Sequence, residues 1–424
     1  MKILFVTNEI PYPPDNGVRI VSHHAMRLMY EAGHELALAV LTEETDDLDT
    51  RFRKAASFCQ NGMAWWIALP SHSRLSVQLT AILTNRLFFN ERHRCTIFRK
   101  KLIRLIEDFQ PDVIHFDLIP MTQYHDVTPI GVGTVASIND SYALTLENGF
   151  SAGNYKGIQH AYRKIQYHQT RRYEKIVYPR FNSIHVMAEV DAAYLHQLNT
   201  SNHTDVIPNG VDPSLFGITD ETYGCTDVIF VAKLADGNLV YLRRFLELSW
   251  PIIHKECPEV KLHIVGKKSP ELYDIEVLAE RAGGVFFKGY VECLADAYRG
   301  CGLAVVPVNK NCGIVNKAIE AMAAGLVVVG FEKTFAGVSH GRAGEHFVAV
   351  QDYASMGHAV VALIRNEPYR LAIQKAAHHM ATKYFTWPSR SKAYEQMYQY
   401  VAQQAKKHLK GMTSTDEDKM GTHA

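Results

Sequence analysis

The sequence of 424 residues contains no apolar run near the roughly 20 residues that a membrane-spanning helix needs. Its seven cysteines are odd in number, scattered, and never spaced C-x-x-C. This pattern favours reduced thiols and argues against a structural zinc site. The first stretch, "MKILFV", is too short for the apolar core of a signal peptide. We therefore expect a cytoplasmic protein, with any membrane contact confined to its periphery.

An excess of charge of one sign is also lacking, because 45 Lys and Arg against 44 Asp and Glu leave a net charge of +1. This balance argues against a nucleic-acid-binding protein, although it can hide a local basic patch. Contents of 47% hydrophobic and 21% charged residues are ordinary for a globular protein. The length exceeds one ordinary core and suits two domains of about 200 residues each.

Apolar strands alternate with helical stretches from the first residue, a pattern typical of parallel sheets covered by helices. In the first half, helices are expected over 18–32 and 96–108, and the expected strands are "KILFV", "ELALAVL", "MAWWIAL", "DVIHF", "VGTVASI" and "SIHVM". The pattern restarts near Asp227 with "DVIFVA", "VKLHIVG", "VFFKGY", "GLAVVPV", "LVVVGF" and "HFVAV". The chain is therefore expected to form two α/β domains.

The stretch "VIPNGVDPSLF" lies between the two halves, and its Pro and Gly residues break both helix and strand. We place the domain boundary there, giving domains over 1–207 and 208–387. A last helical stretch over 388–410 is not followed by another strand. The polar tail over 411–424 is expected to be disordered. Two such domains usually hold a ligand in the cleft between them.

The stretch "CGIVNKAIEAMAAGLVVV" predicts a helix over 313–324 that follows a buried strand. Gly313, Lys317 and Glu320 then share one face, opposite a buried apolar stripe. Helices that begin after a strand of an open α/β sheet bind anions at their free N–H groups. The spacing suits a nucleoside diphosphate, with the lysine near phosphate and the glutamate on the ribose diol. An ordinary surface Lys–Glu pair, worth about 0.2 to 0.5 kcal/mol, is the alternative reading.

The same stretch, "GIVNKAIEAMAAGLVVV", resembles the signature of the family-4 retaining glycosyltransferases of GT-B fold, in which a glycine precedes "EAMA-x-G-x-PVV". "PPDNG", "EAGHELALAV", "QPDVIHF" and "VIPNGVD" are similar to the family's first loop, its "GH-x-V" strand, its mid-domain strand and its hinge. The form G-x-x-N-K-x-x-E is closest to polysaccharide-associated members. The resemblance implies two Rossmann-like domains facing across a cleft, with a C-terminal helix that crosses back to the first.

The resemblance also implies roles for individual residues. Glu320 would hold the ribose hydroxyls of a nucleotide-sugar donor, while Gly313 and Ile314 would offer backbone N–H groups to its diphosphate. Lys233, after the strand "VIFVA", matches a basic residue that contacts the pyrophosphate. Gly17 lies in the first loop, where a glycine lets phosphate and acceptor approach. A turn at Gly17 and a solvated charge at Lys233 are the structural alternatives.

Three positions depart from the family pattern. Cys312 stands where the family often has a first glutamate that contacts the donor sugar, and a thiol cannot replace that carboxylate. The second basic residue, expected about five positions after Lys233, falls near Asn238, so Lys317 is expected to share the neutralisation of phosphate. "SINDSY" replaces a common histidine with Asn139 and Asp140. These departures concern the identity of the sugar more than the nucleotide site.

The expected activity is transfer of a sugar from a nucleotide diphosphate sugar to a hydroxyl of a polysaccharide, a lipid-linked glycan or a small metabolite, with retention. Lys233, Lys317 and the helix start would stabilise the departing phosphate electrostatically, so neither a metal nor another cofactor is expected. Asp140 is the first-domain candidate for contacting donor sugar or acceptor, or else an N-cap. A sugar-nucleotide epimerase and a non-catalytic GT-B partner remain the alternative functions.

The segment "RHRCTIFRKKLIRLIEDF", over 92–109, is basic and amphipathic. Such a helix can lie on anionic lipid and bring a domain to a lipid-linked acceptor. An ordinary sheet-covering helix with a solvated basic face is the favoured reading. Peripheral contact with an anionic membrane therefore stays open as a partner hypothesis.

Overall fold

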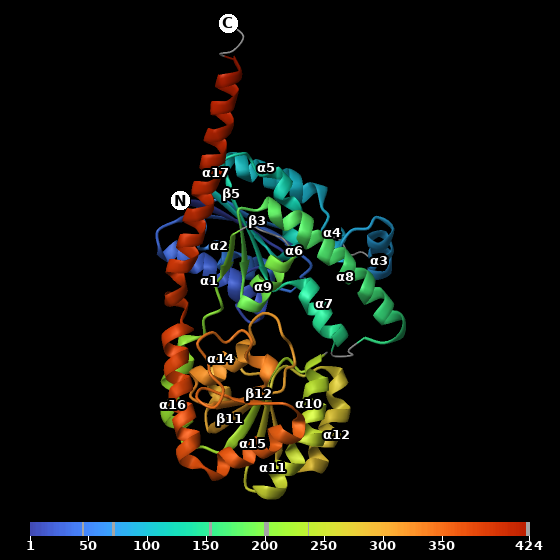
Figure 1. Ribbon diagram of the computed structural model, residues 1–424, viewed down its shortest axis with the longest axis vertical. Helices are drawn as coiled ribbons and strands as arrows, with labels where there is room; N and C mark the ends of the chain where they lie inside the picture. The colour runs from blue at the N-terminus through green and yellow to red at the C-terminus, as the bar shows by residue number, and fades with distance from the viewer. Residues whose placement is uncertain (45, 70–72, 152–154, 199–202, 236, 421–424) are drawn as a thin grey trace. The chain divides into compact units, whose positions relative to one another are not determined.

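The computed structural model describes all residues except 45, 70–72, 152–154, 199–202, 236 and 421–424 (Figure 1). The chain divides into two compact units. Unit 1 comprises Met1–Pro208 together with the chain from Arg390 onward, and unit 2 comprises Asn209–Ser389. Each unit is built on its own sheet, as the restarting strand pattern of the sequence predicts.

Unit 1 contains a seven-stranded parallel sheet in the order β3-β2-β1-β4-β5-β6-β7. Its strands are β1 (Lys2–Thr7), β2 (Glu35–Thr42), β3 (Ala64–Ala68), β4 (Val113–Asp117), β5 (Gly133–Asn139), β6 (Ser183–Val186) and β7 (His203–Val206). The strand order reverses between β1 and β4, and such a point opens a crevice at the carboxyl ends of the strands. Six of the seven strands were expected. The edge strand β7, "HTDV", has only one large apolar residue and was missed.

The helices of unit 1 are α1 (Gly17–Glu31), α2 (Leu48–Ala56), α3 (Arg74–Leu83), α4 (Phe88–Arg92), α5 (Thr96–Phe109), α6 (Leu118–Thr122), α7 (Tyr142–Ser151), α8 (Gly157–Val177) and α9 (Glu189–Gln197). Helix α5 buries Phe98, Leu102 and Phe109 against the sheet in a core that includes Leu4 and Val6 of β1. The segment over 92–109 is therefore a sheet-covering helix, as the favoured reading expected.

Unit 2 contains a six-stranded parallel sheet in the order β10-β9-β8-β11-β12-β13. Its strands are β8 (Asp227–Val231), β9 (Leu262–Val265), β10 (Val285–Gly289), β11 (Cys301–Val306), β12 (Val327–Phe331) and β13 (Val348–Val350). All six match expected strands. The order reverses between β8 and β11, so these two strands flank the crevice expected in this unit.

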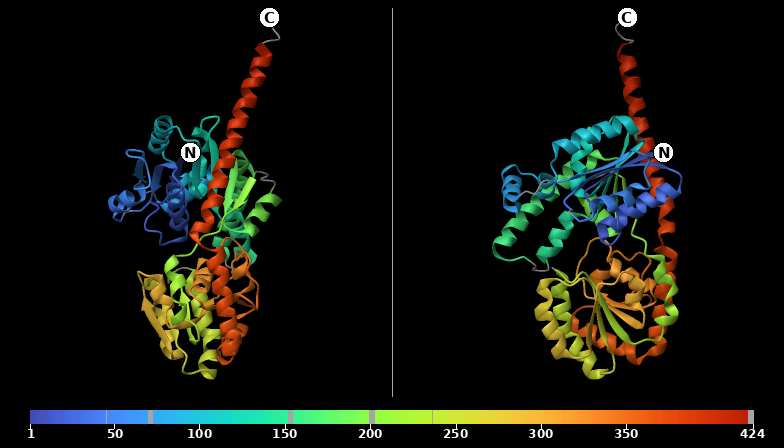
Figure 2. Two further views of the ribbon diagram at one scale, coloured as in Figure 1. Left: turned by 90° about the vertical axis from the view of Figure 1, so that its left-hand side faces the viewer. Right: turned by 180° about the vertical axis from the view of Figure 1, so that it is seen from behind.

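The helices of unit 2 are α10 (Gly237–Leu248), α11 (Trp250–Glu256), α12 (Tyr273–Ala282), α13 (Leu294–Tyr298), α14 (Asn316–Ala323), α15 (Tyr353–Arg365) and α16 (Glu367–Tyr384). They cover both faces of the sheet (Figure 2). On β8, Ile229 points into the core formed with α14 and α16, while Val228 and Phe230 point into the core formed with α10, α11 and α15. Both faces are apolar, which explains why the strands read as continuous hydrophobic runs.

The last helix, α17 (Trp387–Met420), begins in unit 2 and continues into unit 1 from Arg390. Trp387 packs against Gly210, where an added Cβ would lie 2.7 Å from the indole. In unit 1, Tyr398 is buried and its hydroxyl lies 2.9 Å from His115 Nδ1 on β4. The C-terminal helix thus returns to the first domain, as expected. It extends to Met420, so the disordered tail predicted from Gly411 is not observed over 411–420.

Two other boundaries differ from those predicted. Helix α14 begins at Asn316, three residues after Gly313, because Gly313 has φ = +59° and belongs to a loop. The helix of the first loop begins at Gly17, one residue early, because Asn16 caps it by accepting hydrogen bonds from Val18 N and Arg19 N. None of the helices described is both long and apolar enough to cross a membrane.

Candidate functional site

In unit 2, the predicted donor-site residues lie on the loops that follow the neighbouring strands β8 and β11. Lys233 is exposed, two residues beyond the end of β8, and its carbonyl accepts a hydrogen bond from Asn238 Nδ2 at 3.0 Å. Gly313 and Ile314 lie in the loop between β11 and α14. Because parallel neighbours end at the same edge of a sheet, the fold brings these residues to the crevice between β8 and β11.

Lys317, in the first turn of α14, points back toward β8. Its Nζ donates a hydrogen bond to Asn238 Oδ1 at 3.4 Å and lies 5.8 Å from the centroid of the Phe230 ring. Burial lowers the pKa of Lys317 to about 8, while the negative charge of Glu320 opposes this shift. The positive charge of this half-buried ammonium is little compensated by negative groups, so Lys317 is suited to binding an anionic ligand.

Glu320 is one helical turn beyond Lys317, on the same face of α14. Burial raises its pKa to about 7, Lys317 lowers it, and Asp212 raises it further. Among the described residues, no group donates a hydrogen bond to this carboxylate. The nearby Tyr298 is buried, and its hydroxyl also has no hydrogen-bond partner in the described part of the chain. Glu320 can therefore accept hydrogen bonds from a ligand.

The loop that carries Gly313 is held by a close backbone contact. An added Cβ at Gly337 would lie 2.5 Å from Gly313 O and 3.0 Å from Ile314 Cα. The positive φ of Gly313 is a conformation that side-chain-bearing residues rarely adopt. Gly313 thus does not start the helix or share its face with Lys317 and Glu320, contrary to the prediction. Cys312, in place of the family's first glutamate, is buried.

Sequence reasoning missed an asparagine pair that supports this loop. Asn209 Nδ2 donates to Asn316 Oδ1 at 3.0 Å, which ties "VIPNGVD" to the start of α14. Asn209 is 3% exposed, and no described residue donates a hydrogen bond to its Oδ1. The "PNG" motif was interpreted only as a hinge, although its buried amide shows that it also positions the candidate donor site.

Unit 1 contains a cavity of about 700 Å³ at the carboxyl ends of β1 and β4, which we call the β1/β4 cavity. Its lining includes Asp140, together with acidic and aromatic side chains: Glu9, Glu43, Glu44, Phe88, Phe89 and Tyr142. Asp140 does not cap α7, because Ser141 Oγ accepts the hydrogen bond from Leu144 N at 3.2 Å. Ser141 therefore has the N-cap role that was the alternative for Asp140.

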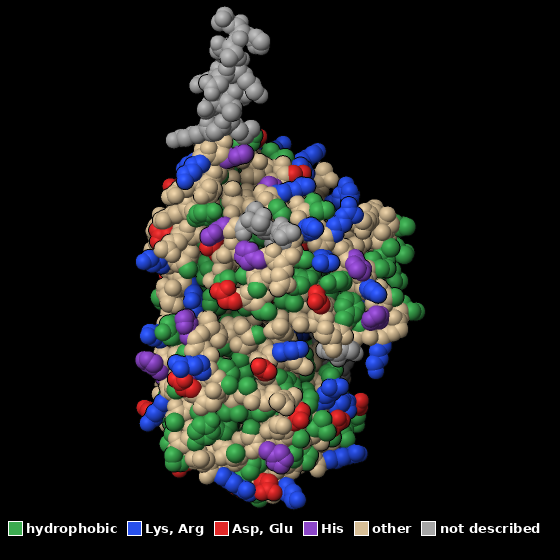
Figure 3. Space-filling model, in the orientation of Figure 1, with side chains coloured by type: hydrophobic (Ala, Val, Ile, Leu, Met, Phe, Trp, Pro, Cys, Tyr) green, Lys and Arg blue, Asp and Glu red, His purple; other side chains and the backbone are tan. Residues whose placement is uncertain are grey.

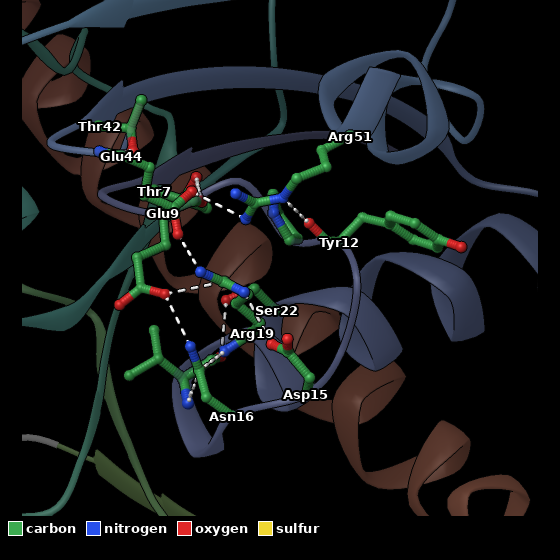
Figure 4. A network of polar contacts seen from close by, with 12 residues as sticks. Thr7, Glu9, Tyr12, Asp15, Asn16, Arg19, Ser22, Thr42, Glu44 and Arg51 are labelled. Carbon is green, nitrogen blue, oxygen red and sulfur yellow. Dashed lines mark hydrogen bonds and ion pairs between the residues drawn. The ribbon is translucent and has the colours of Figure 1, made fainter. Parts of the chain in front are cut away.

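Four residues that line the β1/β4 cavity belong to one network of polar contacts: Glu9, Asn16, Arg19 and Glu44 (Figure 4). Arg19 Nε lies 3.0 Å from Glu9 Oε2, and Arg19 also pairs with Asp15 and Glu44. Asn16 Nδ2 donates to the same Glu9 oxygen at 3.0 Å. Gly17 lies at the start of α1, and nothing lies within 4 Å of the position of an added Cβ. The space beside Gly17 is therefore open, although Gly17 itself is not among the residues that line the cavity.

A buried acid next in sequence to Leu118, which lines this cavity, was also missed. Asp117 ends β4 and accepts a hydrogen bond from Ser22 Oγ at 2.6 Å. Burial raises the pKa of Asp117 to about 7, and the Ser22 hydrogen bond opposes that shift. In the sequence, Asp117 ends the apolar run "VIHF", which gives no sign that its side chain turns inward.

Two family models match the chain, and together they cover most of it. "Glycosyltransferase Family 4" matches residues 16–215, and "Glycosyl transferases group 1" matches residues 225–366. The second match includes Lys233, the loop around Gly313 and all of α14. A search of curated proteins finds no match to the chain.

Solved structures with similar folds were compared over nearly the whole chain. Sucrose-phosphate synthase from Thermosynechococcus elongatus superposes with a TM-score of 0.70 at 16% identity, covering 95% of this chain and 99% of its own. TarM from S. aureus gives 0.67 at 11% identity, covering 94% and 99%. HepE from Anabaena gives 0.63 at 14% identity, covering 95% and 100%. At these identities the similarities concern the fold.

Two parallel Rossmann-like sheets with a returning C-terminal helix define a protein of GT-B fold. The chain belongs to the family-4 type of glycosyltransferases, whose two domain models it matches in order. It is therefore a glycosyltransferase. The resemblance of "GIVNKAIEAMAAGLVVV" to family-4 glycosyltransferases of GT-B fold is thus confirmed.

Proposed function

We propose that unit 2 binds a nucleoside diphosphate sugar and that unit 1 binds the hydroxyl acceptor. The observation that carries this proposal is the pair of side chains on α14. Lys317 and Glu320 both have strongly shifted pKa values, and they lie beside the crevice between β8 and β11 within the matched family region. A Lys–Glu pair exposed on the surface would lack the burial that causes such shifts of pKa.

In this proposal Glu320 accepts hydrogen bonds from the two ribose hydroxyls. Lys233 and Lys317 contact the diphosphate, and the backbone of Gly313 and Ile314 lies along it. Uridine is the base proposed, because structures of the similar Anabaena HepE contain UDP or UDP-glucose. The small Cys312 thiol leaves the donor sugar without a carboxylate contact at that position.

The reaction breaks the bond between the anomeric carbon and the diphosphate oxygen. Negative charge grows on that oxygen, so preorganised cations lower the barrier most directly. Lys233 and Lys317 supply this charge, and we propose that no metal is needed. The acceptor oxygen attacks the face from which the diphosphate leaves, and the departing phosphate takes its proton. This course retains the anomeric configuration.

The β1/β4 cavity is the proposed acceptor site. Its carboxylates, Asp140 among them, accept hydrogen bonds from hydroxyls, and its aromatic rings offer faces to a sugar. Gly17 leaves space at its edge. A polysaccharide or a lipid-linked glycan fits this lining better than a charged metabolite, because Arg19 is already paired with Glu9, Asp15 and Glu44.

Helix α3 supports peripheral contact with an anionic membrane better than the basic segment over 92–109 does. Leu75, Leu79 and Leu83 are 71%, 61% and 85% exposed and recur every four residues, so they form one stripe. Hydrophobic side chains and Lys or Arg are visible together on the edge of the molecule where α3 and α8 lie (Figure 3). This surface can be tested by measuring binding to vesicles with and without anionic lipid. The parent protein would be compared with the double variant Leu79→Glu/Leu83→Glu.

The two alternative functions, an epimerase and a non-catalytic partner, would behave differently in an assay. An epimerase would consume the donor without an acceptor, and a non-catalytic partner would bind nucleotide without turnover. Neither accounts for the acid-lined β1/β4 cavity of unit 1 as well as a transferase does. The buried Cys312 remains the feature that most favours a non-catalytic role.

The deciding experiment measures thermal stability of the protein with UDP, GDP, dTDP, ADP and CMP, each with and without an attached sugar where one exists. A ligand at a hundredfold excess over its Kd stabilises the fold by about 2.7 kcal/mol. We expect a selective shift with one diphosphate, which Glu320→Ala removes. No shift with any nucleotide would reject the donor site.

Two further measurements test the finer points once a donor is known. NMR of the product reads the anomeric configuration, and inversion would reject front-face attack. Assays with and without EDTA test the need for metal. A strict dependence on a divalent cation would reject the metal-free chemistry.

A further inference from the structure

Unit 1 contains a second cavity, of about 610 Å³, that the proposed transfer does not use. It lies between α4, the start of α5, the 3₁₀ segment Gln123–Val127 and α8. We call it the arginine cavity, because four arginines line it: Arg86, Arg94, Arg99 and Arg172. Its volume lies within the range of about 300 to 1,000 Å³ that is usual for small-molecule sites.

Two of these arginines are neutralised within the cavity. Arg86 Nη1 lies 3.4 Å from Glu91 Oε2, and Arg99 Nη1 lies 2.7 Å from Asp126 Oδ1. Among the described residues that line the cavity, these two acids are the only carboxylates. Four positive and two negative side chains leave an excess of two positive charges.

The excess comes from Arg94 and Arg172, whose side chains are exposed. Within the part of the chain that the structure describes, no carboxylate lies within ion-pairing distance of either. The charge of Arg94, like that of Arg99, acts on the Tyr124 hydroxyl in the wall. Guanidinium groups bind phosphate and carboxylate with two parallel hydrogen bonds, so these arginines favour an anion.

A second observation points to hydroxyl groups on the same ligand. Asn90 lines the arginine cavity, is 8% exposed, and its Oδ1 has no hydrogen-bond partner among the described residues. A buried amide oxygen is an acceptor, so it cannot serve an anion but can serve a hydroxyl. The cavity thus combines anion-binding cations with an unused acceptor for a hydroxyl donor.

We infer that the arginine cavity binds an anionic carbohydrate, a hydroxylated ring bearing a phosphate or a carboxylate. Helix α4 forms the wall between the two cavities: Phe88, Phe89 and Arg92 line the β1/β4 cavity, whereas Asn90 and Glu91 line the arginine cavity. A ligand held here therefore contacts the helix that also borders the proposed acceptor. Free sugar phosphates and the acidic residues of a glycan share this chemistry.

Titration calorimetry with glucose 6-phosphate, glucuronate, inorganic phosphate and glucose tests the site. We expect glucose 6-phosphate or glucuronate to bind more tightly than phosphate and glucose. The double variant Arg94→Ala/Arg172→Ala should weaken that binding at least tenfold and still fold, because both side chains are exposed. Arg104→Ala, an exposed arginine of α5 outside the cavity, is the matched control and should bind like the parent protein.

The two anionic probes also separate the sources. Preference for glucose 6-phosphate indicates a free sugar phosphate, and preference for glucuronate indicates an acidic glycan; both support the site. Equal weakening by Arg104→Ala would show unspecific attraction, and unchanged binding by the double variant would place the probe elsewhere. Loss of binding in Glu320→Gln would assign the probe to the donor site. Each of these three results, or no binding at all, overturns the inference.

Discussion

Lys317 reaches from α14 to Asn238, at the start of α10, with Nζ 3.4 Å from Oδ1. Asn238 stands near the position where the family carries its second basic residue. Lys317 thus places its ammonium beside the residue at that position, and we propose that it supplies the missing charge from a different element. Asn238 also holds the carbonyl of Lys233 at 3.0 Å, so one amide links the two lysines.

Lys317→Met should lower kcat/KM for the donor by about 100-fold or more, since hydrogen bonds to charged groups contribute about 1.5 to 3 kcal/mol and this charge also acts in the transition state. Steady-state kinetics with a fixed acceptor measure the effect. Lys375→Met, an exposed lysine of α16, is the matched control. A change below threefold for Lys317→Met would remove this lysine from the site.

Glu320→Gln should stabilise the free protein while weakening nucleotide binding. Burial raises the folded pKa of Glu320 from its usual 4.5 to about 7, so stability is lost as pH rises between these values. At pH 8 the substitution should add about 1 to 3 kcal/mol to the free energy of unfolding. The gain should vanish near pH 4.5. Urea unfolding at both pH values measures it, and destabilisation at pH 8 would contradict the assignment.

Donor affinity should be greatest between about pH 7 and pH 8. Below its pKa of about 7, Glu320 loses its charge and one of its two acceptor oxygens becomes a donor, and above its pKa of about 8, Lys317 loses its charge. Beyond each value affinity should fall about tenfold per pH unit. A nucleotide sugar is the proper probe, because its phosphates do not titrate in this range. Glu320→Gln should abolish the acidic limb, and Lys317→Met the alkaline limb.

Gly337→Ala should disturb the loop between β11 and α14, which carries Gly313, although Gly337 is not part of that loop. Its Cβ would lie 2.5 Å from Gly313 O, a backbone atom that cannot rotate away. We expect the KM for the donor to rise at least tenfold, with a smaller loss of stability. Gly217→Ala, where nothing lies within 4 Å of the new Cβ, is the control. Equal donor kinetics in both variants would show that the loop is not at the site.

Twelve of the thirteen strands could be predicted from the sequence, because both faces of each sheet are covered and the strands read as apolar runs. The start of α14 could not be predicted from the sequence, because apolar periodicity continues through Ile314 and Val315 while Gly313 adopts a left-handed conformation. Lys317 and Glu320 were found because helical spacing places them together. The hydrogen bonds of Asn209 to Asn316, of Asn238 to Lys317 and of Asp117 to Ser22 were missed because they join segments that are distant in the sequence.

The buried hydrogen bond between Tyr398 and His115 gives the last prediction, on how α17 is held to unit 1. Tyr398→Phe removes the hydroxyl 2.9 Å from His115 Nδ1 and leaves a buried ring nitrogen unpaired. The free energy of unfolding should fall by about 1 to 3 kcal/mol, the range for an unsatisfied buried polar group.

Tyr400→Phe tests whether this loss is specific. Tyr400 lies two residues on in α17, with its ring 4.2 Å from that of His203, and this contact keeps its geometry without the hydroxyl. The change should stay within about 0.5 kcal/mol, as for most surface substitutions. Burial keeps the pKa of His115 well below its usual range, so the cost of Tyr398→Phe should not change between pH 6 and pH 8. A cost that grows toward pH 6 would mean that His115 is charged, and α17 would then be held by a different bond.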